Sequence, residues 1–248
     1  MIIRSLLQFV AVGIILLMAC GEYHAPFQNP FDPLVNRPNT PANSLLIEDF
    51  DDGEMGNLLG YCHETFVDKF SLVGIDQPLA SIEASYVDIK QPANVLRGVG
   101  RSRRITFDIT KSSSKGDAFG GYTELLVAND ICKLDRGPFN LEGLKLDTLT
   151  FWVKAESPGI NMEVALKDVD NNITEPKRLI QDCLRPNANT VWRKAKIPIK
   201  DLVSAGNGKK VNLRQLREIN FGFGKARFIK DCGELAGTIY LDEIAFER

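Results

Sequence analysis

After residue 44, the sequence consists of short apolar runs that alternate with polar residues and end at Gly, Pro, Asn or Asp. Between residues 105 and 109, for example, Ile, Phe and Ile alternate with Thr and Asp, which is typical of a half-buried strand. Beyond the first twenty residues, no stretch keeps apolar residues at helical spacing over three turns. Many short strands favour an all-β fold, an antiparallel sandwich or barrel. We expect strands at 45–50, 64–70, 81–89, 103–110, 122–127, 148–155, 161–166, 177–181, 191–197, 218–223 and 238–246.

The size and charge of the chain limit its organisation and its partners. Residues 45–248 are enough for one large core, and a single sandwich of that length is common, so we predict one domain. The formal net charge of the whole chain is -2, and no basic run occurs. A nucleic acid partner is therefore not expected.

The first twenty residues have the layout of a cleaved secretory signal. A single positive charge at Arg4 precedes a mostly apolar run that ends at Ala19-Cys20. This run is too short for a membrane-spanning helix. The small residue before Cys20 resembles the bacterial lipobox, which implies a lipoprotein signal at 1–19 and lipidation of Cys20. An ordinary signal peptide with a chance cysteine is the alternative.

Residues 20–44 are expected to be a Pro-rich tether between the anchor and the domain. The segment after Cys20 holds five prolines and few aliphatic residues, so it can bury little surface. Packing of this segment on the domain through Phe27 and Phe31 is the alternative. The lipobox resemblance implies a bacterial cell-envelope protein held at the membrane by its lipid anchor. Gly21 follows the cysteine where Asp would mark inner-membrane retention, which implies the outer membrane.

Four further cysteines predict disulfides. An even count in an exported protein favours a disulfide framework, here with three possible connectivities. A zinc site with His63 and a free catalytic thiol are weaker alternatives, because no C-x-x-C pair occurs and the chain has only two histidines. The disulfide candidates are Cys62, Cys132, Cys183 and Cys232.

Several local features can be read from single segments. In 148–155 both faces carry bulky residues, so we expect a central strand in which Trp152 packs. A turn at Pro158-Gly159 predicts that 161–166 returns as a hairpin. Pro198 cannot donate to a ladder, so its strand should end there or lie at an edge. A change of parity in the last strand predicts a bulge near Asp242-Glu243.

Five segments, taken in order, resemble a known family. They are LIEDFDDG (46–53), TLTFWVKAESPGINMEVALKD (148–168), TVWRKAKIPIKDL (190–202), LRQLREINFGFG (213–224) and GTIYLDEIAFE (237–247). Together they are similar to the galactose-binding-like jelly-roll modules, such as carbohydrate-binding module family 11 and the complex I intermediate-associated protein 30 domain. The resemblance implies an antiparallel jelly-roll β-sandwich over 45–248.

The resemblance also implies carbohydrate binding, which usually relies on aromatic faces with polar groups nearby. The loop SSSKGDAFGGY (112–122) is Gly- and Ser-rich with two aromatic residues, as expected of a binding rim. Core or loop packing is the competing interpretation for each aromatic residue. The carbohydrate-binding candidates are Tyr61, His63, Phe119, Tyr122 and Trp192, with Arg101, Arg103 and Asp117 as polar partners.

Relatives in this fold often carry a structural calcium that joins the first strand to the last. Calcium prefers six to eight oxygen ligands from carboxylates and carbonyls. If the first and last strands are neighbours, Glu48 or Asp51 could meet Asp242, so these three residues are the calcium candidates. A turn of solvated acids is the alternative. No other cofactor is expected.

We expect no catalytic activity, because no hydrolase, zinc-protease or phosphate-loop motif is present. The predicted function is therefore non-catalytic polysaccharide binding by a membrane-anchored surface lipoprotein, with glycoside hydrolases or other surface proteins as possible partners. The rival interpretation is a structural or assembly lipoprotein that binds a protein partner through the same sandwich. An accessory or lost-activity domain of a hydrolase is a third.

Overall fold

The computed structural model describes residues 43–53, 56–67, 79–113, 116–127, 138–183, 190–230 and 233–248. The chain divides into two compact units, Met1–Val35 and Asn36–Arg248, and all described residues belong to the second. The expected signal peptide, Cys20 and nearly all of the tether lie outside them, as do Cys132 and Cys232. Within the described ranges, no helix is long and apolar enough to cross a membrane.

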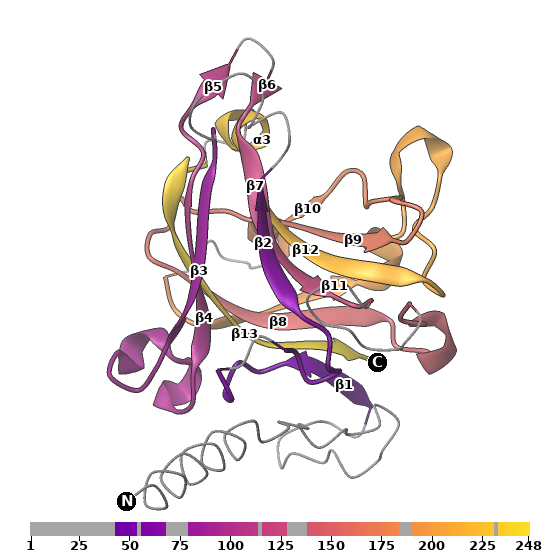
Figure 1. Ribbon diagram of the computed structural model, residues 1–248, viewed down its shortest axis with the longest axis horizontal. Helices are drawn as coiled ribbons and strands as arrows, with labels where there is room; N and C mark the ends of the chain where they lie inside the picture. Colours follow the sequence, from indigo (N-terminus) through magenta and orange to yellow (C-terminus); the bar gives the residue numbers. More distant parts are fainter. Residues whose placement is uncertain are drawn as a thin grey trace, which may run out of the picture. The chain divides into compact units, whose positions relative to one another are not determined.

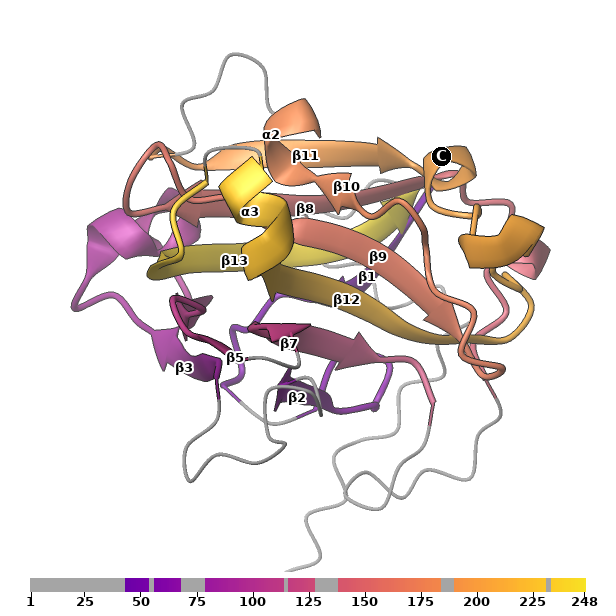
Figure 2. The same ribbon diagram turned by 90° about the horizontal axis from the view of Figure 1, so that it is seen from above.

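The domain is a jelly-roll β-sandwich built from two antiparallel sheets (Figures 1 and 2). One sheet has the order β11-β8-β13-β4-β3, and β1 pairs with the remaining stretch of β13. Its strands are β1 (Ser44–Glu48), β3 (Ser81–Val87), β4 (Ser102–Asp108), β8 (Thr148–Ala155), β11 (Arg193–Pro198) and β13 (Ala236–Glu247).

The second sheet has the order β10-β9-β12-β7-β2. Its strands are β2 (His63–Val67), β7 (Phe119–Leu125), β9 (Glu163–Asp168), β10 (Arg178–Leu179) and β12 (Leu216–Gly224). A small hairpin pairs β5 (Ser112–Ser113) with β6 (Gly116–Asp117). Short helices are α2 (Ile180–Cys183), α3 (Lys225–Lys230), and the 3-10 turns η2 (Pro92–Asn94), η3 (Leu96–Gly98), η4 (Glu142–Leu144), η5 (Ile199–Asp201) and η6 (Gly206–Gly208).

Aromatic rings join the two sheets at the core. Phe107 of β4 stacks on Phe223 of β12 with ring centroids 4.2 Å apart, and Phe228 of α3 meets both rings edge-on. All three side chains are buried. Since aromatic side chains bury the largest apolar areas, this trio anchors one end of the sandwich.

Every one of the eleven strands expected from the sequence is present, with ends shifted by a few residues. The all-β antiparallel prediction is therefore confirmed. It could be made from the sequence because alternation of apolar and polar residues shows which face of a strand is buried. The short helix α3 was not expected, because six residues between two strands are too few to show helical periodicity.

Two predictions about edges and bulges are confirmed. β11 lies at the edge of its sheet and ends at Pro198. The pairing of β13 with β8 shifts register between Asp242 and Ala245, and Glu243 has a φ of 43°. β8 lies inside its sheet, between β11 and β13, as expected, and the half-buried Trp152 lies 5.8 Å from the guanidinium of Arg97.

The predicted hairpin at Pro158-Gly159 is wrong. β8 belongs to the six-stranded sheet, whereas β9 pairs with β10 and β12 in the other sheet. The chain therefore crosses from one layer to the other at this turn. A Pro-Gly turn signals a change of direction, but it does not say whether the next strand pairs with the previous one or packs against it.

Cys62 is disulfide-bonded. The side chains of Cys132, Cys183 and Cys232 lie outside the described part of the chain, so the connectivity stays a prediction.

Candidate functional site

Part of the outward face of the five-stranded sheet, on β7 and β12, consists of glycines. In β12, Phe221 and Phe223 point into the core, so Gly222 and Gly224 between and after them lie on the outward face. Gly222 pairs with Gly121 of the neighbouring strand β7. Glycine within a strand often marks a place where another group approaches the backbone closely.

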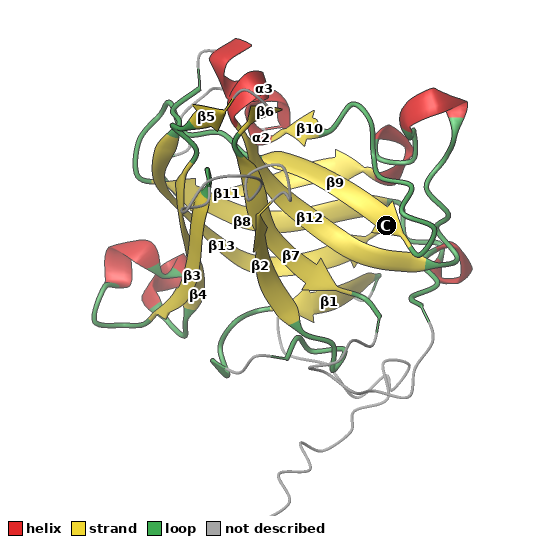
Figure 3. Cartoon of the chain, turned by 45° about the horizontal axis from the view of Figure 1, so that its top comes forward, coloured by secondary structure: helices red, strands yellow, loops and turns green. Residues whose placement is uncertain are grey.

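Two phenylalanine rings occupy the space that these glycines leave. A Cβ added to Gly121 would lie 2.4 Å from the Phe221 carbonyl oxygen and 3.0 Å from the ring of Phe66. One added to Gly222 or Gly224 would lie 3.2 or 3.1 Å from the ring of Phe119. The two ring centroids are 5.8 Å apart. We call the three glycines, Phe66 and Phe119 the glycine-floored platform; Figure 3 shows its strands β2, β7 and β12 side by side.

A pocket of about 380 Å³ adjoins the Phe119 end of the platform, which is within the usual range for small-ligand sites. The Lys177 Nζ lies 3.8 Å from the Phe119 ring centroid and 3.4 Å from Glu163 Oε2. The lining thus combines an aromatic face with groups of both charge signs. Its other members are Gly116, Asp117, Ala118, Gly224, Lys225, Ala226 and Arg227.

Further along the same face, the side chains are polar but buried. Asn220 Nδ2 donates to Glu218 Oε2 at 2.7 Å, and Lys167 Nζ lies 3.2 Å from Glu218 Oε1. Asn220 and Glu218 are only 6% and 7% exposed. The β12 part of this face is therefore more accessible at the end that carries Phe119 and the pocket.

The structure brings two of the predicted carbohydrate contacts together at this pocket. Asp117 is exposed at the end of β6, and Phe119 is half-buried at the start of β7. Both come from the Gly- and Ser-rich segment that was expected to form a binding rim.

Four other predicted contacts are wrong, because their side chains are buried inside the sandwich. Tyr61, His63, Arg103 and Tyr122 are at most 7% exposed. The Arg103 guanidinium carbon lies 5.2 Å from the ring centroid of Tyr122, and that ring also packs against Phe221. A sugar cannot reach these rings without opening the core.

The last two predicted contacts lie away from the platform. Trp192 precedes β11 and packs against the cluster of Val87, Val95 and Tyr240, which confirms the packing alternative for this residue. Arg101 binds the turn after β1, where its backbone N–H donates to Asp51 Oδ1 at 3.0 Å and its side chain donates to the Asp52 carbonyl.

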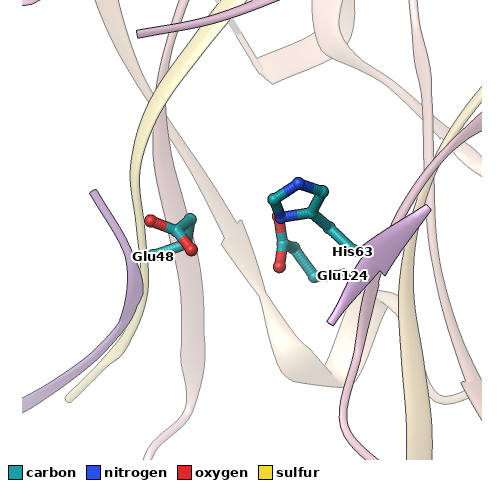
Figure 4. A group of neighbouring side chains, drawn as sticks. All are labelled: Glu48, His63 and Glu124. Atoms are coloured by element: carbon teal, nitrogen blue, oxygen red, sulfur yellow. The ribbon is translucent and has the colours of Figure 1, made fainter. Parts of the chain in front are cut away.

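Inside the sandwich, Glu48, His63 and Glu124 form a cluster that the sequence did not predict (Figure 4). One ligand atom from each side chain lies within 4.8 Å of the other two. Burial raises the pKa of Glu124 to about 7, although hydrogen bonds from Tyr122 and Asn57 oppose this shift. Burial, and then the charge of Glu124, raise the pKa of Glu48 well above its ordinary value.

His63 is neutral in this surrounding. Burial lowers its pKa to about 4, and the nearby charge of Arg103 acts in the same direction. The Tyr86 hydroxyl lies 3.3 Å from His63 Nε2.

The predicted calcium ligands do not form one cluster in the described part of the chain. β1 and β13 are neighbours, as expected, but Glu48 belongs to the inner cluster and Asp51 accepts from Arg101. Ser102 Oγ donates to Asp242 Oδ2 at 2.5 Å, and burial raises the pKa of Asp242 to about 7. Calcium binding stays a prediction, and these three residues would have to move to share an ion.

Phe66, Glu163 and Lys177 were missed from the sequence. The usable signal was parity: since Phe221 and Phe223 face the core, the intervening glycines must face outward and leave room for a ring. No sequence signal places Lys177 over Phe119. Lys177 directly precedes β10, and the two residues meet only through the pairing of β10, β9, β12 and β7.

Comparison with solved structures gives similar folds at low identity. The family 30 carbohydrate-binding module of the Clostridium thermocellum cellulosomal cellulase Cel9D-Cel44B is 14% identical, with a TM-score of 0.48, covering 82% of this chain and 95% of that one. The family 11 module of Lic26A-Cel5E from Clostridium thermocellum is 14% identical, with a TM-score of 0.46 and coverages of 81% and 92%.

A family 61 module solved with β-1,4-galactotriose is 13% identical, with a TM-score of 0.39 and coverages of 81% and 94%. The comparison with curated proteins found no match.

The family comparison is more direct than these structural similarities. The family model of carbohydrate binding domain 30 matches residues 87–248, from the end of β3 to the C-terminus and more than half of the chain. The matched residues include Phe119, Glu163, Lys177 and the glycines of β12. The chain therefore belongs to the carbohydrate binding domain 30 family.

Proposed function

We propose that this protein is a non-catalytic polysaccharide-binding lipoprotein that holds a glycan chain on the glycine-floored platform. The observation that carries the proposal is the position of Phe66 and Phe119, whose rings pack against the glycine positions of β7 and β12. An aromatic ring that packs on glycine positions offers an apolar face to the C–H groups of a sugar ring. Membership of a carbohydrate-binding family supports this use of the surface.

The charged groups around Phe119 suit the sugar hydroxyls. Lys177 supplies three donors and Glu163 supplies acceptors, and both border the same ring. A sugar that stacks on Phe119 takes the place of the Lys177 ammonium, which then turns to a hydroxyl while Glu163 stays in reach. The pocket thus recognises hydroxyl groups beside an apolar face.

The localisation part of the proposal depends on the sequence of the first 44 residues. A lipidated Cys20 and a Pro-rich tether would hold the domain at the outer membrane of a bacterial cell, near glycoside hydrolases or other surface proteins. The role is to keep a polysaccharide close to the cell.

A glycan array followed by affinity measurements on the purified protein tests the binding surface. We expect the wild type to bind one polysaccharide class, and Phe119→Ala to weaken binding at least about tenfold, which corresponds to roughly 1.4 kcal/mol. Phe66→Ala should have a similar effect. Val191→Ala is a matched control, because Val191 is an exposed apolar residue that precedes β11 in the other sheet.

Equal affinity of Phe119→Ala, Phe66→Ala and Val191→Ala would contradict the assignment of the platform. A folded wild type that binds no polysaccharide would favour the rival role, in which the sandwich binds a protein partner.

A further inference from the structure

The cluster of Glu48, His63 and Glu124 lies between the two sheets. His63 of β2 and Glu124 of β7 are direct cross-strand partners, so their side chains project from the same face of the five-stranded sheet. Glu48 ends β1, which belongs to the other sheet. Figure 4 shows the Glu48 carboxylate across from the His63 ring and the Glu124 carboxylate.

Two atoms of this cluster are buried without a hydrogen-bond partner. Glu48 is 1% exposed and its Oε2 has no partner, while His63 is 5% exposed and its Nδ1 has none. A buried polar atom without a partner is costly, and native proteins rarely keep one without a reason. Here two such atoms belong to side chains whose ligand atoms lie within 4.8 Å of each other and of Glu124.

The remaining atoms of the three side chains are held in place by neighbours. Glu48 Oε1 accepts the backbone N–H groups of Asp49 and Phe50, at 2.8 and 2.5 Å. Glu124 accepts from the Tyr122 hydroxyl and from Asn57 Nδ2. His63 Nε2 meets the Tyr86 hydroxyl at 3.3 Å. Such outer contacts orient metal ligands in known sites.

Arg103 does not neutralise the carboxylates by direct contact. Its guanidinium carbon lies 4.6 Å from the Tyr86 ring centroid and 5.2 Å from that of Tyr122, and its Nε is buried without a hydrogen-bond partner. Among the described residues, no ion pair joins Arg103 to Glu48 or Glu124. The charge of Arg103 favours the ionised forms of Glu48 and Glu124 from a distance, and neither carboxylate forms an ion pair with it.

We propose that Glu48, His63 and Glu124 bind a divalent transition-metal ion of the zinc type, which joins β1 to the five-stranded sheet. One imidazole nitrogen with two carboxylates suits such ions, whereas calcium prefers six to eight oxygens. Tetrahedral ligands at about 2.1 Å from zinc lie about 3.4 Å apart, so the site closes modestly around the ion. This site is independent of the platform, and it shares only Glu48 with the calcium site expected near Asp242.

Zinc bound to the purified full-length protein, measured by equilibrium dialysis and elemental analysis, tests the stoichiometry. We expect one Zn²⁺ per chain, and at least about tenfold weaker binding for the near-isosteric variants Glu48→Gln and Glu124→Gln. Asp242→Asn is a matched control, because Asp242 is a buried carboxylate outside the cluster. His24→Ala should bind as the wild type does.

A second measurement keeps the proposal testable if the glutamine variants do not fold. In His24→Ala, His63 is the sole histidine, so one nitrogen-15-labelled imidazole reports on the site directly. Addition of Zn²⁺ should shift its Nδ1 resonance. The proposal is overturned if the wild type retains no zinc, if both glutamine variants bind equally well, or if the imidazole signal does not move.

Discussion

Gly222 and Gly224 show how an absent side chain can shape a binding surface. The Phe119 ring can lie close to the backbone of β12 because a Cβ at either position would come within 3.2 Å of it. At Gly121 an added Cβ would meet both the Phe66 ring at 3.0 Å and the Phe221 carbonyl oxygen at 2.4 Å. The space that the two tilted rings occupy thus depends on three residues that have no side chains of their own.

Replacement of Gly222 by alanine should change binding more than stability. The added Cβ would sit 3.2 Å from Phe119 Cζ, so the Phe119 ring must move away by a few tenths of an ångström. We expect several-fold weaker glycan binding, while the free energy of unfolding changes by less than about 1 kcal/mol, because alanine in a strand partly offsets the strain.

Affinity titration and chemical denaturation of the same sample separate the two effects. Gly206→Ala is the control, because a Cβ there meets nothing within 4 Å and Gly206 has no positive φ. Wild-type affinity in Gly222→Ala would show that the position of the Phe119 ring does not matter.

At this scale, the sequence predicted the site only in part. Asp117 and Phe119 could be predicted because a Gly-rich loop beside an aromatic residue is visible in one segment. The same segment also contains Tyr122, and its composition does not distinguish this residue from Phe119. Tyr122 lies three residues after Phe119 in β7, so the alternation of side chains along the strand places it on the inner face. Glu163 and Lys177 come from distant segments, so only the strand pairing reveals them.

At the scale of elements, the sandwich depends on the contact between β4 and β12. Phe107 stacks on Phe223 across the two sheets and also contacts Phe228. Phe107→Ala should therefore lower the free energy of unfolding by about 3–5 kcal/mol, the usual cost of removing a buried phenylalanine side chain.

Urea unfolding followed by tryptophan fluorescence measures this loss. Ile89→Ala, at a position that is 65% exposed, should change stability by less than about 0.5 kcal/mol. A loss below about 1 kcal/mol in Phe107→Ala would mean that the sheets are held together elsewhere.

The strands were the most predictable elements, and their pairing the least. Alternation within β4 or β12 depends only on local burial, so it is visible in the sequence. The crossing from β8 to β9 depends on the relation of two layers, and a Pro-Gly turn fits either arrangement. The bulge in β13 was visible because it breaks parity inside one strand.

At the scale of the whole molecule, the proposed anchor makes a direct prediction. Cys20→Ser removes the thiol that would carry the lipid, so the protein should move from the membrane fraction to the soluble fraction of the cell envelope. Cell fractionation with immunoblotting measures this change. Cys62 cannot be lipidated in place of Cys20, because it is buried in the domain and disulfide-bonded. Unchanged sedimentation of Cys20→Ser would contradict lipid anchoring.

The pairing of β1 with β13 has a mechanical consequence. The chain enters the domain at Ser44, which is opposite Glu247, so a pull on the preceding segment loads the hydrogen bonds of this strand pair first. Among the described strands, β1 pairs with β13 alone, and its last residue is Glu48. Force on the tether, such as drag on a bound polysaccharide, would thus reach the buried carboxylate of Glu48. An ion bound there would resist the separation of β1 from the rest of the domain.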